Sequence, residues 1–164
     1  MIAEKREAAA NPGVRVPPPF LFLLGLGLAW LLETRVARIR LVGGSASPEA
    51  LERVGLALLL AGLFLIFWGL ATFARARTGI LPIRPASRIV THGPYRFTRN
   101  PMYTGMALSY FGGALAVNSG WALLLMPLVL YTLYRLVIRR EERYLSSAFP
   151  EEYESYRRRV RRWL

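Results

Sequence analysis

The residues best placed to do chemistry in this chain lie between positions 91 and 105. This stretch contains the only histidine, His92, followed by a Gly-Pro pair and then by tyrosines, arginines and an asparagine within a few residues of one another. It stands directly against the uncharged run Asn100–Tyr134, which is long enough to enter a lipid bilayer. The pattern therefore predicts a polar site at a membrane interface.

Composition agrees with a membrane location. Of 164 residues, 54% are hydrophobic, yet the formal net charge is +12, so apolar and basic residues must be separated along the sequence. The length suits a single domain. Because the chain has no cysteine and one histidine, disulfides, cysteine nucleophiles, a metal centre and a Ser-His-Asp triad are not expected.

Several segments have the length and composition of membrane helices. Val54–Ala74 carries no charge and would extend roughly 30 Å as a helix. Asn100–Tyr134 is too long for one crossing and is interrupted at Asn118-Ser119-Gly120, which predicts a helical hairpin whose second arm runs from Trp121 to about Ile138. With the shorter Val16–Leu32, the fold class is all-α: a polytopic membrane bundle of about four transmembrane helices.

The distribution of basic residues predicts an orientation. With four crossings, 18 of the 22 basic residues fall in the N-terminal tail, the 75–99 loop and the C-terminal tail, which places all three in the cytoplasm. Acidic residues beside the first basic ones, and the lack of a small-residue cleavage pattern after Leu32, favour a retained first helix over a signal peptide.

The C-terminal tail has helical periodicity. Five apolar or aromatic residues share one face of a helix that would begin at Pro150: Phe149, Tyr153, Tyr156, Val160 and Trp163. This predicts an amphipathic interfacial helix with its aromatic face inward and its arginines at anionic headgroups. The same arginines suit nucleic acid, but the attached hydrophobic bundle favours membrane lipids as partners, with no nucleic acid. A second role, as a lid that closes the cofactor site against water, is favoured over an anchor alone because Glu141-Glu142 leads into this helix after only a few residues.

A helical hairpin returns its two ends to the same membrane surface. We therefore expect Arg99–Tyr103 to lie beside Glu141-Glu142. The alternative is that these charged residues only mark the interface. That interpretation leaves the residues 92–95 and the tyrosine at 103 unexplained.

Four ordered motifs in the C-terminal half resemble those of the isoprenylcysteine carboxyl methyltransferase and phospholipid methyltransferase superfamily. They are Ile-Val-Thr-His-Gly-Pro-Tyr-Arg (89–96), Arg-Asn-Pro-Met-Tyr-Thr-Gly (99–105), Glu-Glu-Arg-Tyr-Leu (141–145) and the segment 149–160. The resemblance implies an integral membrane enzyme that transfers the methyl group of S-adenosyl-L-methionine without a Rossmann domain. Consistent with this, Gly25-Leu26-Gly27 lacks the context of a dinucleotide fingerprint and is interpreted as helix-packing glycine.

The resemblance also implies a division of the chain and a set of contacts. The single domain would comprise a tail (1–15), N-terminal helices (16–74) and a cofactor-binding catalytic core (75–164). Asparagine at position 100 replaces a histidine that is common in the family. The implied cofactor-binding residues are Arg88, Ile89, Val90, His92, Gly93, Tyr95, Asn100, Pro101, Tyr103 and Glu141.

Methyl transfer depends on alignment of the reacting atoms and exclusion of water more than on covalent help from the protein. Arg99 and Arg140 are candidates to orient an anionic acceptor, and Glu142 to take a proton from a neutral one. Arg140 is equally well explained as a headgroup anchor. The acceptor would be a hydrophobic or lipid-like small molecule. The alternative function is a non-enzymatic membrane protein that binds anionic lipid or a protein partner.

Overall fold

The chain folds into helices that run side by side and carry a cap of shorter elements at one end. A computed structural model describes residues 13–14, 16–42, 48–76 and 88–163. Within these ranges there is no strand beyond one isolated bridge, which confirms the all-α prediction. The elements are α2 (Pro18–Arg35), α3 (Pro48–Ala76), η1 (Gly93–Arg96), α4 (Pro101–Ala116), α5 (Gly120–Leu133), η2 (Tyr134–Ile138), α6 (Arg139–Ala148) and α7 (Pro150–Arg159).

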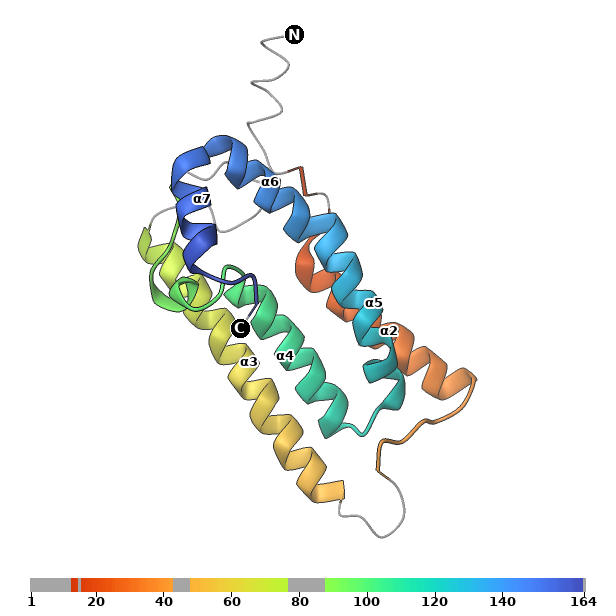
Figure 1. Cartoon of the computed structure of the whole chain (residues 1–164). Helices are drawn as coiled ribbons and strands as arrows, with labels where there is room; N and C mark the ends of the chain where they lie inside the picture. Colours follow the sequence, from red (N-terminus) through yellow and green to blue (C-terminus); the bar gives the residue numbers. More distant parts are fainter. Residues whose placement is uncertain (1–12, 15, 43–47, 77–87, 164) are drawn as a thin grey trace.

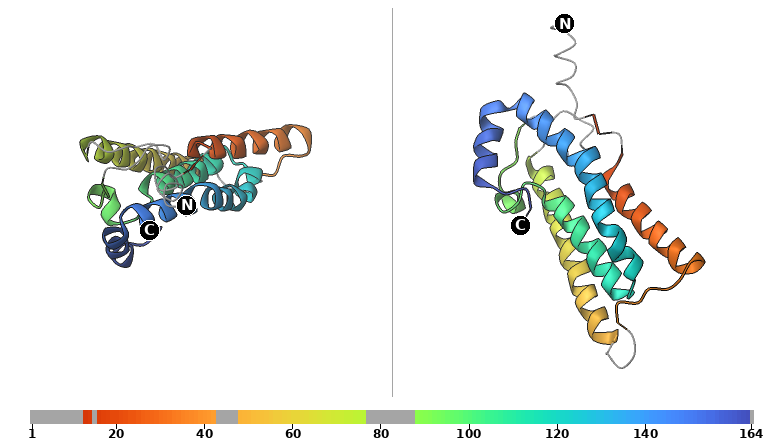
Figure 2. Two further views of the ribbon diagram at one scale, coloured as in Figure 1. Left: turned by 90° about the horizontal axis from the view of Figure 1, so that it is seen from above. Right: turned by 45° about the vertical axis from the view of Figure 1, so that its right-hand side comes forward.

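The long helices form two packed pairs. α3 packs along α4 and α2 packs along α5, while α4 also contacts α5 and joins the pairs (Figure 1). The segment around η1, α6 and α7 lies at the end of the bundle where α2 begins and α3 ends (Figures 1 and 2). Residues far apart in the sequence are therefore gathered at this end.

Among the described residues, two helices are long and apolar enough to cross a membrane: α3, and the continuous helix Gly120–Ala148 formed by α5, η2 and α6. α2 and α4, with 18 and 16 residues, do not meet the same measures of length and hydropathy. The count of about four crossings thus stays a prediction. The π-helical segment η2 ends at Ile138, where the second hairpin arm was expected to end, and α6 follows without a break because the arginines and glutamates there are good helix formers.

The predicted interruption of the hairpin is confirmed. Asn118 has a φ of 55°, a left-handed conformation that asparagine tolerates. Its Oδ1 accepts hydrogen bonds from the amides of Leu41 (2.8 Å) and Val42 (3.1 Å), and Ser119 caps α5 by accepting from the Ala122 amide. The turn therefore also fixes the segment that follows α2.

Backbone-to-backbone packing holds α3 against α4. A Cβ atom on Gly62 would lie 2.5 Å from the Gly105 carbonyl oxygen, and one on Gly112 would lie 2.5 Å from the Gly55 carbonyl oxygen. Helices approach this closely only where small residues face each other, a common device in membrane bundles. The rigid pair that results carries the site residues at its end.

The glycines of α2 follow the prediction only in part. A Cβ on Gly25 would lie 2.6 Å from Val129 Cγ2, which confirms its packing role. Nothing lies within 4 Å of a Cβ on Gly27, so the prediction is wrong there. Gly27 points away from the α2–α5 contact.

The tail helix is shorter than its periodicity predicts. α7 begins with Pro150 and has acidic residues in its first turn and arginines in its last, as expected. It ends at Arg159, and Val160 is extended, so the prediction of a helix through Trp163 is wrong. Tyr153 and Tyr156 are 2% and 4% exposed and thus contact protein. The prediction that the aromatic face of this helix lies on lipid therefore does not hold for these two rings.

Candidate functional site

Gly93 starts the turn that carries the η1 residues into the site. Its φ is +62°, and a Cβ atom at this position would lie 2.7 Å from Thr72 Oγ1 on α3. Both observations require glycine. Pro94, in the first turn of η1, is buried, and Tyr95 follows it into the interior. The Gly-Pro pair therefore serves as a structural turn and also sets the direction of Tyr95.

Tyr103 and Glu141 meet across the two arms of the hairpin. The Tyr103 hydroxyl donates a hydrogen bond of 2.7 Å to Glu141 Oε1, and Tyr103 is only 6% exposed. The predicted proximity of Arg99–Tyr103 to Glu141-Glu142 is thus confirmed. The buried Tyr103 hydroxyl thus holds the Glu141 carboxylate beside the first turn of α4.

Tyr95 adds a second buried hydroxyl. Its ring packs edge-on against Phe73 (5.1 Å between centroids), and its carbonyl accepts a 2.6 Å hydrogen bond from Tyr156. Burial, followed by the nearby Tyr156 and Glu141, raises the pKa of the Tyr95 hydroxyl far above its usual range. The hydroxyl is buried and has no partner among the described residues, so it is a protonated donor available to a ligand.

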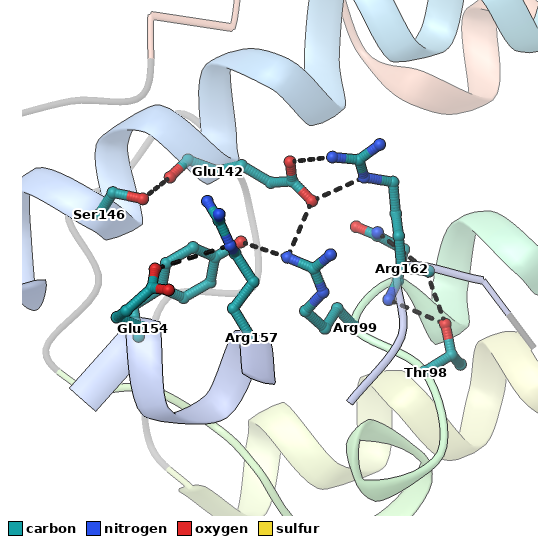
Figure 3. Close-up of polar contacts among 9 residues, drawn as sticks. Thr98, Arg99, Glu142, Ser146, Glu154, Arg157 and Arg162 are labelled. Carbon is teal, nitrogen blue, oxygen red and sulfur yellow. Dashed lines mark hydrogen bonds and ion pairs between the residues drawn. The ribbon is translucent and has the colours of Figure 1, made fainter. Parts of the chain in front are cut away.

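A cluster of charged residues surrounds Glu142, the neighbour of Glu141 in the chain (Figure 3). Glu142 Oε1 lies 3.3 Å from Arg99 Nη1, and Arg162 donates to both Glu142 oxygens, at 2.9 and 2.8 Å. Arg99 Nη1 also donates to the Tyr153 hydroxyl at 3.3 Å. The Arg99 side chain is 10% exposed, and its Nε is buried without a partner in the described part of the chain.

Arg162 is the member of this cluster that sequence reasoning missed. It belongs to a run of tail arginines that were all interpreted as headgroup anchors. No spacing rule separates it from its neighbours, since it lies beyond the end of α7. Sequence reasoning also missed Thr98. Its Oγ1 donates to the Arg162 carbonyl at 2.9 Å, a contact between residues 64 positions apart that no local pattern reveals.

The other predicted cofactor-binding residues differ in how deeply they are buried. Asn100 is buried and its Nδ2 donates to the Arg162 carbonyl at 3.1 Å. Pro101 opens α4 and is buried. Val90 is buried and Ile89 half-buried, whereas Arg88 and His92 are exposed.

Arg140 lies outside the charged cluster. Its Nη1 donates to the Gly13 carbonyl at 2.7 Å, which connects the helix α6 to the segment that precedes α2. A role in orienting an acceptor stays a prediction for this residue.

Comparison with known proteins places this membrane-type helical fold and its site in a family. The model of the phospholipid methyltransferase family matches residues 51–152, a range that includes the whole hairpin and both ends that form the site. The chain belongs to this family, within the isoprenylcysteine carboxyl methyltransferase and phospholipid methyltransferase superfamily. The family and the two long apolar helices together indicate a membrane protein.

Curated relatives match different lengths of the chain. Protein-S-isoprenylcysteine O-methyltransferase of Schizosaccharomyces pombe is 36% identical over 72 residues, 44% of this chain and 30% of that protein. Cobalt-zinc-cadmium resistance protein CzcN of Cupriavidus metallidurans is 37% identical over 75 residues, 46% and 35% of the two chains. Nickel-cobalt-cadmium resistance protein NccN of Alcaligenes xylosoxydans xylosoxydans is 28% identical over 154 residues, 92% and 70%. The first two matches thus span about a third of those relatives, and no solved structure matches the chain.

The residues present fit a ligand such as S-adenosyl-L-methionine. Such a ligand needs acceptors for its hydroxyl and amino groups, donors for its carboxylate and aromatic or carbonyl groups near its sulfonium. Glu141 offers a carboxylate held by one donor, and the buried Tyr95 hydroxyl is a donor without a partner in the described ranges. Buried polar atoms of this kind are rare in native proteins and suggest an interaction with a ligand.

Proposed function

We propose that this chain is a membrane-embedded methyltransferase that uses S-adenosyl-L-methionine and methylates a hydrophobic or lipid-like acceptor. The observation that carries the proposal is the part-buried Tyr103–Glu141 hydrogen bond across the hairpin, near the buried Tyr95 hydroxyl, which has no partner in the described part of the chain. A purely structural scaffold has no need of a half-buried carboxylate close to a buried donor that lacks a partner among those residues, since both are costly. Family membership supports the same activity.

The cofactor, when bound, supplies a methyl group activated by a sulfonium. In this proposal Glu141 accepts hydrogen bonds from the cofactor while Tyr103 holds the carboxylate in place. The protonated Tyr95 hydroxyl donates a further hydrogen bond. Gly93 and Pro101 shape the backbone on either side, and the buried tyrosines of α7 exclude water.

Of the two arginines predicted to orient the acceptor, Arg99 is a better candidate than Arg140. The Arg99 guanidinium is largely buried, and its donor Nε has no partner among the residues that the structure describes, which suits an anionic or strongly polar group on an otherwise apolar molecule. Both oxygens of Glu142 are occupied by Arg162 and one also faces Arg99. Glu142 is therefore arranged to hold arginines, and its role as a proton acceptor stays a prediction.

A two-stage experiment tests the proposal. Full-length protein purified in detergent is titrated with S-adenosyl-L-methionine, and labelled methyl transfer is then measured to N-acetyl-S-farnesylcysteine and to phosphatidylethanolamine vesicles, two acceptors suggested by the names of the family and its relatives. We expect saturable binding and transfer to one of them. Absence of cofactor binding would contradict the enzyme and favour the non-enzymatic alternative. Binding without transfer to either probe would contradict the acceptor class.

The orientation is also a proposal: the end that carries η1, α6 and α7 faces the cytoplasm. Since the chain has no cysteine, single cysteines can report it. An impermeant thiol reagent added to intact cells is expected to label Val117→Cys, at the opposite end and 73% exposed, and to leave Ser146→Cys on α6 unlabelled until the cells are opened. Labelling of Ser146→Cys in intact cells would reverse the orientation.

A further inference from the structure

The last described residues form an extended segment, Val160–Trp163, which we call the C-terminal strap. It runs beside the residues that precede α4, with a parallel bridge between Thr98 and Arg161. The Arg99 amide donates to the Arg161 carbonyl at 2.8 Å, and the side chains of Thr98 and Asn100 donate to the Arg162 carbonyl at 2.9 and 3.1 Å. The strap backbone is thereby fixed at the edge of the site.

This attachment gives the Arg162 side chain a defined direction. Its guanidinium lies 5.2 Å from the centroid of the Tyr134 ring and donates through Nε and Nη2 to the two oxygens of Glu142. An arginine guanidinium is always charged in proteins, and the hydrogen bond to Glu142 raises the pKa of Arg162 further above its usual value. A paired contact of this kind fixes geometry as well as distance, which a lysine cannot reproduce.

The pairing determines what remains for Arg99. Glu142 has its two oxygens held by Arg162, so Arg99 shares only Oε1, at the longer distance of 3.3 Å. Two guanidinium groups thus face one carboxylate, and the cluster retains an unbalanced positive charge next to the buried Nε of Arg99. If Arg162 were absent, Glu142 would be free to turn fully towards Arg99 and occupy its donors.

We propose that Arg162 is a positioning residue: its paired hydrogen bonds hold Glu142 away from full engagement with Arg99, and they leave the Arg99 guanidinium oriented and charged for the acceptor. The proposal rests on the proposed function and adds a tail residue to the acceptor side of the site. The cofactor side, formed by Tyr95, Tyr103 and Glu141, does not depend on it.

The experiment compares two variants, Arg162→Gln and Arg162→Lys, with the control Arg157→Gln. Arg157 belongs to the same tail but is exposed, and its ion pair is with Glu154, at 3.6 Å on its own helix. For the probe acceptor that the wild-type protein methylates, we expect kcat/KM of both Arg162 variants to fall roughly tenfold or more, with unchanged cofactor affinity. The control should equal the wild type.

A double-variant cycle with Glu142→Gln tests whether Arg162 acts through Glu142. Once Glu142 is neutral, removal of Arg162 should cost little more, so the two losses are not additive. Additive losses would overturn the proposal, as would wild-type kcat/KM in both Arg162 variants or weaker cofactor binding in both. If Arg162→Gln does not fold, Arg162→Lys retains the charge and decides the matter. If the wild-type protein transfers no methyl group, the proposed function itself fails. If the wild-type protein is active and the Arg162 variants keep its kcat/KM, only the role of Arg162 fails.

Discussion

Replacement of Glu141 by glutamine is expected to weaken the binding of S-adenosyl-L-methionine by roughly ten- to hundredfold. The substitution keeps the size of the side chain, removes its charge and replaces one acceptor oxygen by an NH2 donor. Loss of one hydrogen bond to a charged group costs about 1.5–3 kcal/mol. Tyr103→Phe removes the hydroxyl that donates to Glu141 at 2.7 Å and should also weaken the binding of S-adenosyl-L-methionine. Titration of the detergent-purified protein with the cofactor measures both effects.

Tyr110→Phe is a matched control for the tyrosine variant. Tyr110 is also buried in α4, and its hydroxyl donates to the Ala122 carbonyl at 3.0 Å, within the bundle and away from Glu141. Its loss should reduce stability and leave cofactor affinity intact. Because Tyr103 acts through Glu141, the double variant should bind little worse than Glu141→Gln alone. Wild-type affinity in both single variants would remove the pair from the cofactor site.

Gly112→Ala is expected to disrupt the α3–α4 pair, whereas Gly113→Ala is expected to be tolerated. A Cβ on Gly112 would lie 2.5 Å from the Gly55 carbonyl oxygen, so the helices must move apart; a Cβ on Gly113 meets only a Leu59 methyl group, at 3.7 Å. Alanine favours the helix equally at both positions, by about 1 kcal/mol over glycine. The difference between the variants therefore isolates the contact, and overpacking of this type costs about 1–3 kcal/mol.

Thermal unfolding of the two variants in the same detergent, followed by size-exclusion chromatography, measures this difference. We expect Gly112→Ala to unfold at a lower temperature than wild type and Gly113→Ala to unfold at the same temperature or higher. Gly112→Ala should also weaken cofactor binding, because separation of the two helices displaces Tyr103 on α4 from Thr72 on α3, which lies against Gly93. Equal unfolding temperatures for the two variants would contradict the close packing.

The sequence by itself determined the hairpin and the centre of the site. The turn at 118–120 interrupts an uncharged run too long for one crossing, and a hairpin must return its ends to one surface. That reasoning brought Tyr103 to Glu141, and a hydrogen bond joins them. It succeeded because the information is local: periodicity and turn residues act over a few positions, and the connection between the arms is short.

Only the tertiary structure decided the course of the tail and the partners of Glu142. Apolar periodicity predicted a helix through Trp163. Instead, the carbonyl groups of residues 161 and 162 accept hydrogen bonds from residues 98–100, more than sixty positions earlier in the sequence. The same long-range contact selects Arg162 from a run of similar arginines and directs it to Glu142, while Arg140 turns to Gly13. Side-chain type and spacing carry no record of such pairings, because they depend on which surfaces meet after the helices have packed.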